Sequence, residues 1–204
     1  DNPELIYASI SGYGQEGPYA ERPGTDTVIQ AFSGMMSFNR DALGQPTKIG
    51  FLVVDTLTSL YAFQAISSAL YARLAGAGGR RLDVSLMQAS AAFLGLKAIE
   101  AALEGDTPKA LNAPAGVYRT RDGWISVTLS KETQYTALCR ALDRPDLRDD
   151  PRYASFETRA DHQAELMRAI GAELLRDDTA NWIVRIEQAG ALASPVNTMQ
   201  QWFA

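Results

Sequence analysis

Cysteine and histidine are almost absent from this sequence, which has one of each, Cys139 and His162, among 204 residues. A single cysteine excludes an internal disulfide framework and fits a reducing cytoplasm, where we expect the protein to reside. Cys139 lies in an apolar helical pattern, and we expect it to be a small buried apolar residue. No cluster of side chains indicates a metal, and none is expected.

Basic charge is also in short supply. The 19 lysine and arginine residues are outnumbered by 24 aspartate and glutamate residues, which gives a net charge of -5. Such a chain has no basic field to neutralise phosphates, and nucleic acid is excluded as its main partner.

No apolar run is long enough to span a bilayer and no signal-peptide pattern opens the chain, so we expect no membrane contact. The chain begins with Asp1 rather than an initiator methionine, and we expect it to be a fragment of something longer.

The composition that is present, 46% hydrophobic and 21% charged, is that of a soluble globular protein with room for one big domain or two small ones. Residues 5–10 and 80–85 are short runs typical of buried strands, and apolar patterns of helical spacing follow them. This alternation predicts an α/β domain with a mostly parallel sheet over residues 1–104. Prolines and glycines mark residues 105–115 as a linker.

Beyond the linker the pattern changes. Asp122 and Gly123 separate two strand-like runs, residues 117–120 and 124–129, which is a hairpin signal. Helical patterns fill most of what remains. Residues 116–204 are therefore predicted to form a small α+β domain.

The first domain is organised around residues 49–58, where a short apolar run ends in Asp55 and a long helical pattern follows. Apolar residues recur at three- and four-residue steps from Leu57 to Leu74, which predicts one apolar face of an α-helix of about five turns. Asp55 is therefore expected at the N-cap, where its carboxylate would accept hydrogen bonds from backbone N–H groups. On spacing alone it is either an ordinary helix cap or a nucleophile, and both interpretations stay open.

Several stretches carry, in order along the chain, a resemblance to one family. They are Tyr7–Gly14, Gly17–Tyr19, Arg22–Asp26, Gln30–Gly34, Gly78–Leu86, Arg121–Ile125, Asp149–Tyr153 and Pro195–Thr198. Together they resemble the class III CoA-transferases, the family of formyl-CoA transferase, carnitine CoA-transferase and the α-methylacyl-CoA racemases. The likeness runs from end to end but covers only part of a family chain, because the opening strand–helix units and the C-terminal return segment of the family are missing.

The resemblance implies a Rossmann-like large domain and places the nucleophilic aspartate of the family at Asp55. It implies transfer of coenzyme A, as a substrate and not as a bound cofactor, between an acyl-CoA and a carboxylic acid. Asp55 would form a mixed anhydride and then an aspartyl-CoA thioester, and backbone N–H groups at the helix start would stabilise the tetrahedral oxyanions. The resemblance also places Pro23, Gly24, Thr25 and Asp26 in the CoA and acyl pocket, and it implies an interlocked homodimer.

Two alternatives are an acyl-CoA racemase of the same family and an inactive fragment that acts only as a binding or assembly piece. The racemases carry a histidine where this chain has Thr25, which cannot move protons at neutral pH, and His162 lies in the other predicted domain. Racemase activity is therefore disfavoured. A nucleotide-binding domain is weaker still, because the glycine-rich loop 11–19 lacks the dinucleotide spacing and no phosphate loop occurs. The glycine-rich lid of the transferases has no clear match, since residues 112–116 are shorter.

Overall fold

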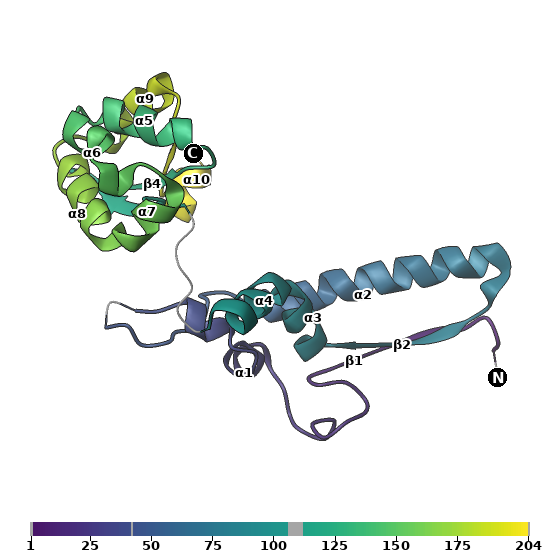
Figure 1. Ribbon diagram of the computed structural model, residues 1–204. Helices are drawn as coiled ribbons and strands as arrows, with labels where there is room; N and C mark the ends of the chain where they lie inside the picture. The colour runs from purple at the N-terminus through teal and green to yellow at the C-terminus, as the bar shows by residue number, and fades with distance from the viewer. Residues whose placement is uncertain (1, 42, 106–111, 204) are drawn as a thin grey trace. The chain divides into compact units, whose positions relative to one another are not determined.

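The computed structural model describes residues 2–41, 43–105 and 112–203, and the chain divides into two compact units, Asp1–Asp106 and Thr107–Ala204 (Figure 1). Each unit has its own cluster of buried apolar side chains. Most of the predicted linker lies outside the described residues.

The first unit is built on two parallel strands, β1 (Ile6–Ser11) and β2 (Arg80–Ser85), paired from Ile6 opposite Arg80 to Ser11 opposite Ser85. The predicted parallel pairing of an α/β unit is confirmed. A helical crossover joins the two strands, and two more helices follow β2. The helical elements of this unit are α1 (Asp26–Phe32), η1 (Met35–Phe38), α2 (Val53–Ala72), η2 (Arg73–Ala77), α3 (Leu86–Phe93) and α4 (Gly95–Glu104).

Helix α2 lies along the strand pair and packs through small side chains (Figure 1). Thr58, Ala62 and Ala69 are at most 5% exposed, whereas Phe63 and Tyr71 are 68% and 77% exposed. Helix α2 contacts β1, β2 and α3. The small residues on its buried face let its backbone approach these elements closely. The sequence predicted that the large apolar residues form the buried face of this helix. Several of them are instead exposed in the described part of the unit, and small residues form much of the buried face.

The second unit contains an antiparallel sheet in the order β3 (Gly116–Arg119), β4 (Trp124–Thr128), β5 (Leu192–Pro195). Arg119 pairs with Trp124 across the turn that contains the Asp-Gly signal, so the predicted hairpin is confirmed. Helices surround the sheet, and the unit has the predicted α+β character. They are α5 (Glu132–Ala141), α6 (Pro145–Asp149), η3 (Pro151–Tyr153), α7 (Phe156–Asp161), α8 (Gln163–Leu174), α9 (Thr179–Ala189) and α10 (Met199–Phe203).

Arg159 is fully buried in the core of the second unit. Its guanidinium donates hydrogen bonds to the carbonyl oxygens of Ala113 at 2.9 Å and Tyr153 at 2.8 Å, and it pairs with the Glu132 carboxylate. Its central carbon lies 4.3 Å and 4.7 Å from the ring centroids of Tyr135 and Phe156. A buried charge is tolerated only when it is paired and fully hydrogen-bonded, and these contacts satisfy that requirement.

Cys139 is 1% exposed, so its predicted place in the core is confirmed, and burial raises the pKa of its thiol. Among the residues that the structure describes, no single helix is long and apolar enough to cross a membrane. The pair α3 and α4 passes that test of length and composition only when taken together across a bend of 61°.

Candidate active site

Helix α2 begins at Val53, with Leu52 as its N-cap residue, and Asp55 is the third residue of the helix. The prediction that Asp55 occupies the N-cap is therefore wrong. Leu52 has no side-chain oxygen, and the capping group comes from another segment of the chain. Asp26 Oδ2 accepts the N–H of Val54 at 2.7 Å and the N–H of Asp55 at 3.2 Å. A carboxylate at this position satisfies free N–H groups and complements the positive end of the helix dipole.

The flanking N–H groups at the start of α2 are engaged as well. The N–H of Val53 donates to the Phe51 carbonyl at 2.9 Å, and that of Thr56 donates to the Leu52 carbonyl at 3.1 Å. The N–H groups of residues 53–56 therefore all have acceptors within the protein. The prediction that N–H groups at the helix start stabilise tetrahedral oxyanions is wrong for these four, because a donor already in use is not available to a developing oxyanion.

Asp55 is exposed, although its backbone N–H is engaged by Asp26. Across residues 2–41, 43–105 and 112–203, no protein group donates a hydrogen bond to its carboxylate. The backbone carbonyl of Asp55 accepts the Ser59 hydroxyl at 2.9 Å, so the main chain is held on both sides of the Asp55 Cα atom. The Asp55 carboxylate is therefore accessible to a substrate, and the backbone that carries it is fixed.

Asp26, the second predicted site carboxylate, is 4% exposed and belongs to the first turn of α1. Its Oδ1 accepts a hydrogen bond from Gln30 Nε2 at 2.5 Å. Gln30 is fully buried, and its Oε1 accepts the N–H of Ile49 at 2.8 Å. Both oxygens of Asp26 are thus occupied by protein donors, and little of the side chain is left for direct contact with a ligand.

The other predicted site residues lie in the turn that leads into α1. Gly24 packs against the loop after β1 so closely that a Cβ atom on Gly24 would lie 2.8 Å from Gly12 Cα, and only glycine fits there. Thr25 is the N-cap residue of α1, exposed, and its side chain makes no capping hydrogen bond. Pro23 lines an open groove of about 590 Å³. The lining of that groove consists of Tyr13, Arg22, Pro23, Val28, Ala31 and Phe32.

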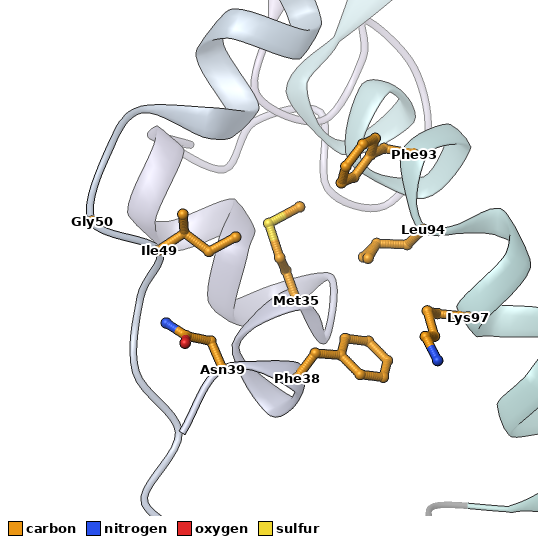
Figure 2. A pocket seen from close by; sticks show the side chains of 8 residues that line it. All are labelled: Met35, Phe38, Asn39, Ile49, Gly50, Phe93, Leu94 and Lys97. Atoms are coloured by element: carbon orange, nitrogen blue, oxygen red, sulfur yellow. The ribbon is translucent and has the colours of Figure 1, made fainter. Parts of the chain in front are cut away.

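A second cavity, of about 470 Å³, borders the segment that leads into α2 (Figure 2). It is lined by Met35, Phe38, Asn39, Ile49, Gly50, Phe93, Leu94 and Lys97. Figure 2 shows Lys97 on the side facing Phe38, and its Nζ lies 5.9 Å from the centroid of that ring. The walls are mostly apolar, and the Lys97 ammonium is already paired with the Glu100 carboxylate, so the cavity suits an apolar group. This cavity was not predicted from the sequence, because its residues follow no motif and meet only in the folded unit.

No group of three or more histidine, cysteine, aspartate or glutamate side chains in the described ranges is arranged to hold a metal ion. The described part of the first unit contains two features that could serve a reaction. They are the exposed carboxylate of Asp55 and two open cavities.

Comparison with known proteins connects this geometry to one family. The sequence pattern of CoA-transferase family III matches residues 1–204. A succinate–glutarate CoA-transferase of Agrobacterium fabrum is 32% identical over 100% of this chain and 52% of that protein. An acetyl-CoA:oxalate CoA-transferase of Acetobacter aceti is 33% identical over 96% of this chain and 52% of that protein. The chain thus spans about half the length of the curated relatives it matches.

A solved structure of a CAIB/BAIF family protein from Brucella suis has the same fold. It matches with a TM-score of 0.84 and 30% identity, over 99% of this chain and 55% of that chain. The sequence motifs, the relatives and the solved fold agree along the whole chain. This chain belongs to CoA-transferase family III.

Proposed function

We propose that the protein carrying this chain transfers coenzyme A from an acyl-CoA to a carboxylic acid, through covalent intermediates on Asp55. The observation that carries the proposal is the exposed Asp55 carboxylate, free of protein donors among the described residues, at the start of a helix whose N–H groups are already satisfied. The membership of the chain in CoA-transferase family III supports the type of reaction.

The first half of the reaction loads CoA onto the protein. An Asp55 oxygen attacks the thioester carbonyl, the C–S bond breaks, and CoA leaves as a thiolate from a mixed anhydride. The thiolate attacks the Asp55 carbonyl carbon of the anhydride, and the donor acid leaves as a carboxylate. Asp55 now carries CoA as a thioester. Covalent catalysis of this kind replaces one difficult transfer by steps of similar energy.

The second half runs in reverse with a new acid. The acceptor carboxylate attacks the Asp55 thioester carbonyl and releases the CoA thiolate, which leaves a new mixed anhydride. The thiolate attacks the acyl carbonyl of the acceptor and regenerates the Asp55 carboxylate. Bonds and charges balance without an external oxidant, reductant or metal. This scheme is the formyl-CoA transferase-like form of the family chemistry.

Short dicarboxylic acids are the acceptors we propose, because the two relatives described above are named for succinate, glutarate and oxalate. Pro23, Gly24 and Thr25 are proposed to border the CoA and acyl site beside the groove at the start of α1. Thr25 carries a hydroxyl that does not act as a general acid or base at neutral pH, which favours transfer over racemisation. We also propose that the protein is a cytoplasmic homodimer. The large apolar side chains exposed on α2 support a dimer, because a second subunit would cover them.

In the test, the whole protein is incubated with succinyl-CoA or acetyl-CoA, with hydroxylamine added to trap an activated carboxylate. It is then digested, and its peptides are analysed by mass spectrometry. We expect an acyl, CoA or hydroxamate adduct on the peptide that contains Asp55. The isosteric variant Asp55→Asn should lack the adduct and lose at least about a thousand-fold in transfer rate. CoA binding by calorimetry without any adduct would refute the assignment of Asp55, and absence of CoA binding would favour a binding or assembly piece.

A further inference from the structure

We propose that Asp26, held in place by Gln30, is the positioning residue that fixes Asp55 for attack. The inference rests on the proposed role of Asp55 as nucleophile. Asp26 does not need to touch the substrate in this role. It acts through the backbone of the residue that does, because the N–H of Asp55 itself is one of the two backbone donors to Asp26 Oδ2.

The contacts form a short chain of buried polar groups between α1 and the start of α2. Asp26 Oδ2 receives two backbone N–H groups from residues 28 and 29 positions later in the sequence. Asp26 Oδ1 receives Gln30 Nε2, and Gln30 Oε1 receives the N–H of Ile49. The segment that carries Asp55 is therefore tied to α1 at two points, one on each side of the bend before α2.

Because the hydrogen bonds of the Asp26 side chain all run toward its oxygens, replacing one of those oxygens by an NH2 group disrupts the network. An ionised carboxylate only accepts hydrogen bonds, and all its partners here are donors. In Asp26→Asn, one side of the new amide is an NH2 group, which must face either the two backbone N–H groups or Gln30 Nε2. Turning Gln30 around removes the opposed donors but deprives the N–H of Ile49 of its acceptor. Whichever arrangement forms, one buried donor loses its partner.

A double exchange restores the four hydrogen bonds that join positions 26, 30, 49, 54 and 55. In Asp26→Asn/Gln30→Glu the new amide oxygen accepts the N–H groups of Val54 and Asp55, and its NH2 donates to the new carboxylate at position 30. The other oxygen of that carboxylate accepts the N–H of Ile49. The net charge is unchanged. The double exchange replaces one weak hydrogen bond, which Gln30 Nε2 donates to the Phe51 carbonyl oxygen at 3.5 Å, by a contact between two acceptor oxygens.

The experiment measures single-turnover formation of the Asp55 adduct in the intact protein, together with KM and kcat for transfer. A misplacement of the reacting group by about 1 Å costs on the order of a hundred-fold in rate. We expect Asp26→Asn to slow adduct formation by about ten- to a hundred-fold, with KM for acyl-CoA changed by less than about threefold. The double variant should recover to within about fivefold of the wild-type rate.

Hydrogen exchange gives a second measurement that does not depend on activity. We expect the backbone N–H groups of Val54 and Asp55 to exchange faster in Asp26→Asn and to regain protection in the double variant. If Asp26→Asn fails to fold, the double variant still tests the positioning role. A folded double variant whose adduct forms at the wild-type rate supports the proposal, and one that remains a hundred-fold slow overturns it.

Asp41→Asn is the matched control. The Asp41 carboxylate also accepts two backbone N–H groups, those of Leu43 at 2.8 Å and Gln45 at 2.9 Å, but in an exposed turn. It should leave the adduct rate unchanged within about twofold. Wild-type rates in Asp26→Asn, with the adduct still on Asp55, would refute the positioning role alone. An absent adduct in the wild-type protein would instead refute the function on which it rests.

Discussion

Replacing Arg159 by lysine keeps a buried positive charge but removes the flat, forked donor that the core of the second unit is built around. A lysine ammonium directed at Glu132 leaves at least one of two buried carbonyls, those of Ala113 and Tyr153, without a donor. An unpaired buried carbonyl costs about 1 to 3 kcal/mol, and the loss of stacking on two aromatic rings about 1 kcal/mol. We expect Arg159→Lys to lower the free energy of unfolding of the second unit by about 2 to 4 kcal/mol.

Tryptophan fluorescence during urea unfolding measures this unit selectively. The three tryptophans of the chain all belong to it, namely Trp124, Trp182 and Trp202. Arg185→Lys is the control, because Arg185 also stacks on an aromatic ring, at 4.5 Å, and also pairs with a carboxylate, but its side chain is 49% exposed. It should change stability by less than about 0.5 kcal/mol. Equal effects of the two substitutions would refute the argument from burial.

Two further predictions concern groups with shifted pKa values in the second unit. The backbone N–H and the hydroxyl of Thr179 donate to Asp122 and hold the pKa of that carboxyl below its ordinary value. The folded form then binds this proton less readily than the unfolded chain, so the contribution of Asp122 to stability is present above about pH 4 and is lost as pH falls through the lowered pKa. Thr179→Val should move the pKa of Asp122 upward in an NMR titration, and an unmoved pKa would contradict the assignment. Burial raises the pKa of the Cys139 thiol, so iodoacetamide at pH 8 should label native protein at least about tenfold more slowly than urea-unfolded protein by mass spectrometry. Equal labelling rates would show that Cys139 is accessible.

The elements that the sequence predicted correctly are those specified by neighbouring residues. The hairpin around Asp122 and Gly123 follows from local turn chemistry, and β1 and β2 follow from short apolar runs next to loops. Parallel pairing of the two strands follows from the helical crossover between them. In these places local propensity and the final fold agree.

The start of α2 was predicted incorrectly because its cap is not local. A carboxylate just before a helical pattern is the usual sign of an N-cap, but here Asp55 lies inside the helix and the capping carboxylate belongs to a residue 28 positions before Val54. Nothing in the spacing around Asp55 records that contact. The same limit applies to the cavity between η1 and α4, whose walls come from distant segments.

The two sheets also differ in the time that passes during synthesis before each strand has a partner. Ile6 pairs with Arg80, whereas Arg119 pairs with Trp124. At a synthesis rate of about 5 to 20 residues per second, β1 leaves the ribosome several seconds before β2 exists, while β4 follows β3 within about a second. During that interval β1 lacks β2, the strand with which it pairs in the described sheet. Among the strands that the structure describes, β1 is thus the one whose described partner follows it after the longest stretch of synthesis.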